Sequence, residues 1–116
     1  MADGMELWQA LEETIRAAIE ENARANALGI GLAEANAKLR AAKAAKKLEL
    51  KLAGFPVTLI GDLVYGDEGV NEAKRVAEVA QVEYDTSREA VLLRKKEADI
   101  LREQVQREWA AAGRVV

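Results

Sequence analysis

One interruption near the middle of the chain constrains the fold more than any other feature. Residues 53–70 contain the only proline, Pro56, and four of the eight glycines. Because proline cannot continue a helix and glycine weakens one, a helix is expected to end and reverse here. The stretches on either side have similar lengths and a helical pattern. The sequence therefore predicts an all-α fold, an antiparallel helical hairpin of two long helices joined by a short helical tip.

The first predicted helix covers about residues 3–53. Asp3 is its expected N-cap, with Glu6 as the acidic partner three positions later. Gly29 and Gly31 fall inside the helix, where they either admit a close neighbour or form a hinge. Apolar residues recur at steps of three and four, which is typical of one helical face. This face is expected to contain Trp8, Leu11, Ile15, Ile19, Leu28, Leu32, Ala35, Leu39, Ala42, Ala45, Leu48 and Leu52.

The predicted tip covers about residues 54–67. Gly54 suits the left-handed position that follows many helices. Thr58 is expected to cap a short helix over residues 59–65. Asp67 is the expected cap of the second long helix.

The second predicted helix covers about residues 68–112 and is expected to end at Gly113. Its small and apolar residues alternate between steps of four and three, which is the 3.5-residue repeat of a coiled coil. Arg94 is the one charged member of this repeat. The predicted contact face consists of Ala73, Ala77, Ala80, Tyr84, Ser87, Val91, Arg94, Ala98, Leu101 and Val105.

A direct reversal at the tip would place Ala53 beside Gly69. In that register the two tryptophans meet at the open end of the hairpin, and Gly29 and Gly31 lie opposite the bulky run Val91-Leu92-Leu93. A small residue opposite a large one favours close packing of the two helices.

Several large apolar residues fall off or beside the predicted contact faces. A hairpin of two helices buries only one face of each helix, so these side chains would stay in water. The sequence therefore predicts self-association into a coiled-coil-like bundle of four or more helices. The residues concerned are Ile19, Ile30, Leu50, Val76, Val79, Val82 and Ile100.

The chain is poorly supplied with catalytic groups. It has no histidine or cysteine, and Ser87 is its only serine, so a serine triad or a histidine or cysteine metal site cannot be built. The acidic pairs at residues 12–13 and 20–21 lack carboxylates three positions later, the spacing with which two carboxylates on a helix can hold magnesium together. We expect no enzyme activity, cofactor or metal.

A basic block lies in the second half of the first helix, although the net charge of the chain is −3. Such a block could meet phosphates. Ion pairs with Glu72, Glu78, Glu83 and Asp85 are expected to neutralise part of it, and no aromatic residues are interleaved to stack bases. Ion pairing is therefore favoured over nucleic acid or an acidic protein partner. The basic block consists of Lys38, Arg40, Lys43, Lys46, Lys47 and Lys51.

Nothing in the sequence predicts a membrane partner. No apolar run approaches the roughly 20 residues that span a bilayer, and the first residues lack the basic and apolar regions of a signal peptide. The expected location is cytoplasmic.

The tip is rich in large apolar side chains. They either fold onto the ends of the long helices or dock a protein partner. The candidate residues are Leu59, Ile60, Leu63, Val64 and Tyr65.

Several short stretches between about residues 38 and 109 resemble small helical proteins of unknown function from phages and prophages of Gram-positive bacteria. The resemblance implies a phage-borne accessory factor, in recombination and replication or in countering host defence. It implies no site residues. The matching stretches are Pro56-Val57-Thr58-Leu59-Ile60, Asp62-Leu63, Gly66-Asp67-Glu68, Tyr84, Arg88-Glu89-Ala90 and Arg107-Glu108-Trp109.

Together these features predict a non-enzymatic accessory protein that self-associates and binds another macromolecule. One alternative is an anti-defence inhibitor of a host nuclease or nucleotide sensor. The other is a DNA-associated recombination or replication factor that uses the basic block.

Overall fold

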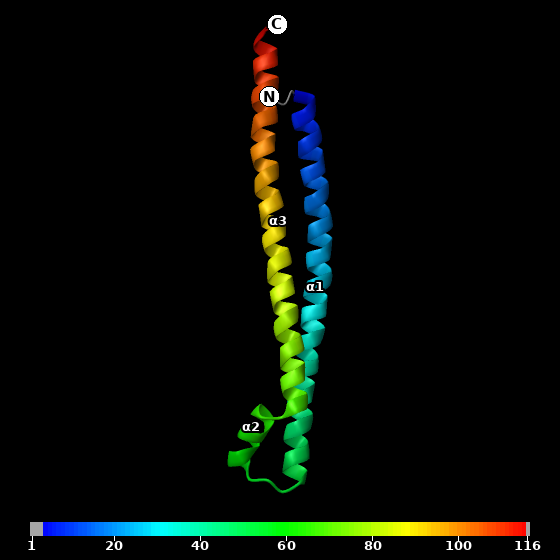
Figure 1. Ribbon diagram of the computed structural model, residues 1–116, viewed down its shortest axis with the longest axis vertical. Helices are drawn as coiled ribbons and strands as arrows, with labels where there is room; N and C mark the ends of the chain where they lie inside the picture. The colour runs from blue at the N-terminus through cyan, green and yellow to red at the C-terminus, as the bar shows by residue number, and fades with distance from the viewer. Residues whose placement is uncertain (1–3, 116) are drawn as a thin grey trace. The chain divides into compact units, whose positions relative to one another are not determined.

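The computed structural model describes residues 4–115 and consists of helices (Figure 1). Helix α1 spans Gly4–Leu52, α2 spans Val57–Tyr65 and α3 spans Glu68–Val115. No strand occurs within the described residues. The predicted all-α helical hairpin is confirmed, whereas the predicted cap Asp3 lies outside the described part of the chain.

The contacts divide the chain into two compact units. Unit 1 comprises Met1–Asn26 and Thr86–Val116, and unit 2 comprises Ala27–Asp85. In each unit a stretch of α1 lies beside an antiparallel stretch of α3 (Figure 1). Helix α2 belongs to unit 2.

The contact face of α3 is the one that its 3.5-residue repeat predicts. Every residue predicted for this face, from Ala73 to Val105, is buried or half-buried. Val91, which is 1% exposed, is the largest fully buried side chain among the described residues. The repeat succeeds because alternating steps of four and three keep one stripe of a helix against its neighbour.

The contact face of α1 differs from the prediction at both ends. Trp8, Ile15 and Ile19 are exposed, and so are Ala45, Leu48 and Leu52. The prediction was wrong there because it followed the largest apolar residues rather than one unbroken repeat. The observed face includes small and polar residues, and it consists of Leu7, Leu11, Thr14, Ala18, Glu21, Ala25, Leu28, Leu32, Ala35, Leu39, Ala42 and Lys46.

The two tryptophans meet at the open end of unit 1, as predicted, but the predicted register is wrong there, because Glu21 lies beside Arg94 rather than Leu101. The rings of Trp8 and Trp109 stack with their centroids 5.8 Å apart. Leu11 shares a buried cluster with Ala98 and Val105.

The predicted register is also wrong in unit 2, where Gly29 faces Tyr84 rather than the run Val91-Leu92-Leu93. Lys46 Nζ lies 3.3 Å from Asp67 Oδ1, so α3 begins level with Lys46 rather than with Ala53. The reason is that α2 runs back along the last turns of α1 before α3 starts (Figure 1). The predicted register assumed that the chain reverses directly from α1 into α3, and it did not allow for the residues of α2.

A Schellman motif ends α1 at Gly54, as predicted. Gly54 has a φ of 87°, and its amide donates to the Lys51 carbonyl at 3.1 Å. The Phe55 amide donates to the Leu50 carbonyl at 3.1 Å. These two bonds satisfy carbonyls that the end of the helix would otherwise leave unpaired.

Helix α2 starts at Val57, two residues earlier than predicted. Pro56 occupies the capping position with an extended backbone, and no side chain caps the helix. The Pro56 carbonyl accepts hydrogen bonds from the amides of Leu59 and Ile60. Thr58 is therefore inside α2 and the prediction that it is a cap was wrong. Proline suits the position because its missing amide would be unpaired there.

Helix α3 continues through Gly113 to Val115, so the predicted stop at Gly113 was also wrong. A single glycine costs a helix interior about 1 kcal/mol, which weakens the last turn without preventing it.

Asp67 caps α3, as predicted. The Val70 amide donates to its Oδ2 at 2.9 Å, and this hydrogen bond lowers the pKa of Asp67 below its ordinary value of 3.8. The ion pair with Lys46 acts in the same direction, and the hydrogen bond to Asp67 raises the pKa of Lys46.

We expect this cap to make the free energy of unfolding of unit 2 depend on pH in the acidic range. Because the folded-state pKa is depressed, the stabilisation is present above about pH 4 and is lost as the pH falls through the depressed value. The unfolding midpoint of the wild type should therefore fall faster between about pH 5 and about pH 2 than that of Asp67→Asn, which keeps a capping oxygen but does not titrate. Parallel pH profiles of thermal unfolding would contradict this expectation.

The two glycines in the middle of α1 are not equivalent. A Cβ atom at Gly29 would lie 3.1 Å from Cε1 of Tyr84, whereas a Cβ at Gly31 would meet nothing within 4 Å. Gly29 thus admits a close neighbour, which was one of the two interpretations of this pair.

Gly31→Ala should raise the free energy of unfolding by about 0.5–1 kcal/mol, because alanine loses less backbone entropy in a helix. Gly29→Ala should gain less, since the Tyr84 ring must shift to accept the new methyl group. Urea unfolding of both variants measures the difference. Equal increases in the free energy of unfolding would show that the Tyr84 ring moves aside without an energetic cost.

Candidate interaction surfaces

The predicted tip residues divide into a buried pair and an exposed set. Ile60 and Val64 are each 5% exposed and share a buried cluster with Leu50 and Val70. These four come from all three helices, so Ile60 and Val64 hold α2 in place. They are not available to a partner, in agreement with the interpretation that the apolar tip folds onto the long helices.

The other three predicted tip residues remain accessible, and two of their neighbours join them. Val57, the most exposed of the five, shows 79% of its surface. Leu59 and Leu63 are one turn apart on α2 and therefore lie on one side of it. We call this set the tip surface, and it consists of Phe55, Val57, Leu59, Leu63 and Tyr65.

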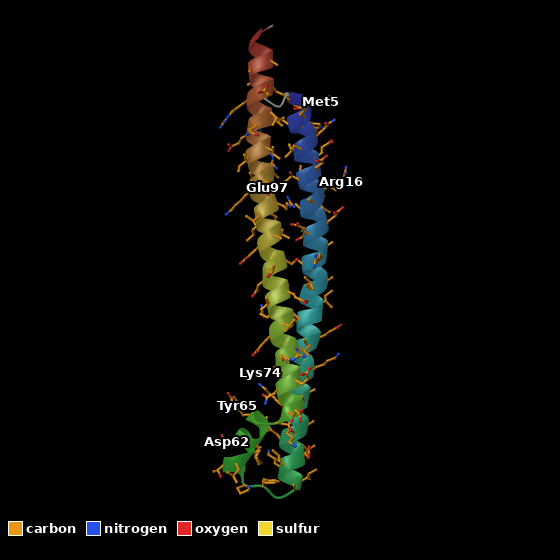
Figure 2. All side chains as sticks on the ribbon, viewed as in Figure 1. Met5, Arg16, Asp62, Tyr65, Lys74 and Glu97 are labelled. Atoms are coloured by element: carbon orange, nitrogen blue, oxygen red, sulfur yellow. The ribbon has the colours of Figure 1, made fainter. Side chains whose placement is uncertain are left out.

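Tyr65 is held by a neighbouring cation on α3. Lys74 Nζ lies 5.7 Å from the centre of the Tyr65 ring, and Figure 2 shows both side chains at the α2 end of unit 2, near Asp62. A cation over an aromatic face at this distance is attracted by the ring. Tyr65 is thus oriented although most of its surface is exposed.

The basic block of α1 is less neutralised than the sequence predicts. Lys46 pairs with Asp67 and Glu49, but no other member of the block forms an ion pair within residues 4–115. Of the acidic residues expected to neutralise the block, Glu72 pairs with Arg75 on its own helix. The shift of register accounts for the other three, because it places Glu78, Glu83 and Asp85 level with residues 28–35, before the block begins.

Four of these unpaired cations lie on one side of α1. Their spacings of three, four and four residues place them along a single stripe, and all four are exposed. We call this stripe the basic row, and it consists of Arg40, Lys43, Lys47 and Lys51.

A groove of about 450 Å³ runs between α1 and α3 in unit 1. Ala18 and Ala98 belong to the contact faces of the two helices, and their small side chains leave the space above them open. The α1 side is mainly apolar and the α3 side is charged. The lining residues are Ile15, Ala18, Ile19, Asn22, Lys95, Ala98, Asp99 and Arg102.

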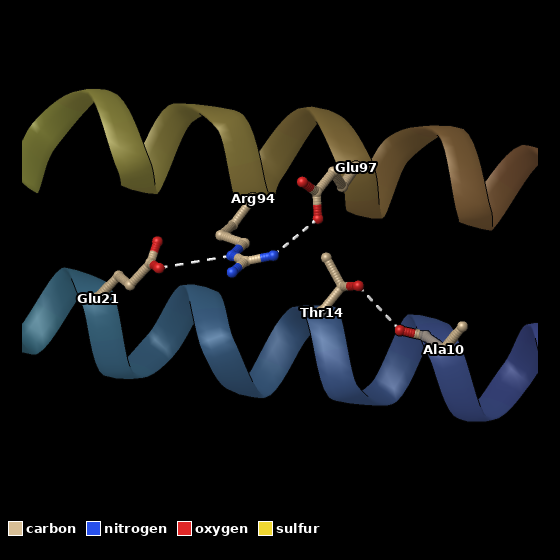
Figure 3. Close-up of polar contacts among 5 residues, drawn as sticks. All are labelled: Ala10, Thr14, Glu21, Arg94 and Glu97. Atoms are coloured by element: carbon tan, nitrogen blue, oxygen red, sulfur yellow. Dashed lines mark hydrogen bonds and ion pairs between the residues drawn. The ribbon is translucent and has the colours of Figure 1, made fainter.

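A polar cluster interrupts the apolar contact face of unit 1. Arg94 Nε lies 3.4 Å from Glu21 Oε1, and Arg94 Nη1 lies 3.1 Å from Glu97 Oε2 (Figure 3). Thr14, also on this face, donates to the Ala10 carbonyl at 2.9 Å. The hydrogen bonds that Arg94 donates to Glu97 and Glu21, and the negative charges of these two residues, raise the pKa of Arg94.

The sequence analysis placed Arg94 on a contact face and Lys46 in the basic block, but it did not place Glu21 or Lys46 on the contact face of α1, where both bond to other helices. A signal for both was present, because the steps of three and four that join Leu28, Leu32 and Leu39 continue through these two positions. A polar pair of this kind disfavours other registers, since a slip would leave a charge without its partner.

The described residues were compared with the requirements of a metal site and of a membrane span. Between residues 4 and 115 no group of three or more carboxylate, histidine or cysteine side chains could hold a metal ion. None of the three helices contains a stretch long and apolar enough to cross a bilayer.

The fold and its surfaces define the class of this protein as an all-α helical hairpin with exposed apolar and charged faces. The chain matches no protein-family model, no curated protein and no solved structure.

Proposed function

We propose that this chain is a non-enzymatic accessory protein of the phage-encoded kind, which self-associates and binds another macromolecule through its tip surface. The exposure of five large apolar side chains on and beside one short helix carries the proposal. Apolar patches of this kind on small proteins are usually interaction sites.

The construction of the tip supports this role. Ile60 and Val64 anchor α2 in a buried cluster, while Leu59 and Leu63 remain on its accessible side. A fixed helix with apolar residues one turn apart is a common form of protein recognition element. The tip surface can thus meet a partner without first unfolding.

Self-association is supported by apolar residues elsewhere on the long helices. Ile19, Ile30, Val82, Leu93 and Ile100 each expose more than half of their surface. A further helix packed over such side chains would bury them, as in four-helix bundles. Sedimentation velocity over a range of concentrations tests this part, and a monomer throughout would contradict it.

A pull-down from host lysate tests the binding role. Tagged wild type should retain a protein that Leu63→Asp, with the same fold, does not retain. Recovery of a host nuclease or nucleotide sensor would support the anti-defence role, and recovery of a replication complex would support the recombination and replication role. Identical recovery by both forms would contradict the tip surface as the binding site.

DNA binding is a second candidate because the basic row is unpaired. Four cations on one stripe of a helix could contact successive phosphates. Binding should weaken steeply as salt rises, and Arg40→Glu with Lys47→Glu should abolish it. Affinity that does not change with salt would contradict this candidate.

A further inference from the structure

The two sides of unit 1 differ in which helix carries the charged residues and in the sign of those charges. Lys95 and Arg102 directly follow contact-face residues of α3, and Ile15 and Ile19 directly follow contact-face residues of α1. These four line one groove. We call this side the apolar-basic face, with its cations on α3 and its apolar residues on α1.

The residues that directly precede the contact-face positions lie on the other side of unit 1, because one residue turns a helix by about 100°. On α1 these are Glu13 and Glu20, and on α3 they are Leu93 and Ile100. All four are exposed. We call this side the apolar-acidic face. Glu13 and Glu20 form its acidic row on α1, Leu93 and Ile100 are its apolar residues on α3, and Glu97, which pairs with Arg94, also lies on its α3 side.

The charges on the two faces have the same spacing. Lys95 and Arg102 are seven residues apart, and so are Glu13 and Glu20. In a helix this separation is about 10.5 Å. Two such rows, packed parallel, can therefore form both ion pairs at once.

We propose that the apolar-basic face of one copy binds the apolar-acidic face of a second copy. This proposal rests on the self-association proposed above. The second copy is turned end over end, so that its α1 lies on the first copy's α3. Each acidic row then meets a basic row, and each apolar row meets an apolar row.

One register satisfies both rows. The Glu21–Arg94 contact places Lys95 level with Glu20 in the same copy. When Glu13 and Glu20 of the second copy lie opposite Lys95 and Arg102, Ile100 of the second copy falls beside Ile19.

Three neighbouring positions agree with this register, whereas Glu97 of the second copy, which pairs with Arg94 in its own copy, falls opposite Ile15. Glu6 continues the acidic row and falls opposite Arg88. Asn22 falls opposite Gln104 of the second copy, so two polar side chains meet. Asp99, which pairs with Arg102 in the groove, falls opposite an alanine.

This contact joins two different faces, so it is heterologous. Each added copy leaves one face of each kind open at the ends of the assembly. The assembly should therefore grow with protein concentration instead of stopping at a symmetric dimer.

Charge reversal tests the proposal by sedimentation velocity at low salt. Lys95→Glu with Arg102→Glu should weaken association by roughly 30-fold, and so should Glu13→Lys with Glu20→Lys, because each replaces attraction by repulsion at two positions. The variant with all four changes should associate like wild type, and so should an equal mixture of the two double variants. Circular dichroism verifies that each variant is folded.

Lys96→Glu with Arg107→Glu is the matched control. It makes the same change of charge on the side of α3 that points away from α1, so association should be unchanged. If wild type associates but neither double variant is weakened, self-association stands and this interface is wrong. A folded four-site variant that stays monomeric would also overturn the interface, and a monomeric wild type would overturn both proposals.

Discussion

Val64→Asp should unfold unit 2, whereas Leu63→Asp should leave it folded. Val64 is 5% exposed within a cluster of Leu50, Ile60 and Val70, whereas Leu63 is 38% exposed. Loss of the buried valine side chain lowers the free energy of unfolding by about 1.5–3 kcal/mol. Burial of an unpaired carboxylate lowers it by several kcal/mol more. The sum is similar to the whole stability of a small protein, about 5–15 kcal/mol.

Two optical signals separate the outcomes of this experiment. Trp8 and Trp109 both lie in unit 1, so tryptophan fluorescence reports on that unit. Far-UV circular dichroism reports on all the helices, and with Val64→Asp it should lose intensity before heating. Unfolding of Val64→Asp at the wild-type midpoint would show that Val64 does not anchor α2.

Leu63→Asp makes the same chemical change at the adjacent residue and is the matched control. Its carboxylate can reach water, so the unfolding midpoint should stay close to that of wild type. The same variant removes an apolar group from the tip surface. Loss of partner binding without loss of stability would therefore separate the function of the tip from its folding.

The tip illustrates how far the sequence determined this fold. Gly54 predicted the end of α1 and Asp67 the start of α3, because both depend on local backbone chemistry. The direction of α2 was not predictable from such local signals. It depends on Leu50, Ile60 and Val70 meeting in one cluster, and this contact shifts the register of α3 against α1 in unit 2.

The contact faces illustrate the same limit. On α3 the alternating steps of four and three run without a break from Ala73 to Val105, so this face was predicted although many apolar residues lie off it. On α1 the large side chains of Ile15 and Ile19 lie one position beyond Thr14 and Ala18, and size outweighed periodicity in the prediction. The exposed isoleucines that result are the residues that line the groove of unit 1.

The candidate surfaces were only partly predictable. The basic block and the tip residues were named from composition, but which members stay accessible depends on packing. Ile60 and Val64 became core, and Lys46 became an ion-pair partner of Asp67. The pairing of charge with apolar surface in unit 1 required knowledge of which α1 and α3 positions share a side.

Ala25→Leu should destabilise unit 1 by about 1–3 kcal/mol, the usual cost of adding methylene groups to a filled core. Ala25 is 0% exposed. The Glu21–Arg94 contact places it level with Ala90, next to the buried Val91. A leucine at this position must push the two helices apart or leave its preferred rotamer.

Ala23→Leu is the matched control, because Ala23 is exposed on the same helix and leucine is nearly as good a helix former as alanine. Urea unfolding followed by tryptophan fluorescence should shift to lower midpoints with Ala25→Leu alone. If Ala25→Leu is as stable as Ala23→Leu, the helices are not held at close distance by small residues. The same result would weaken the role of Glu21 and Arg94 in fixing the register, since that pair requires the two backbones to stay close.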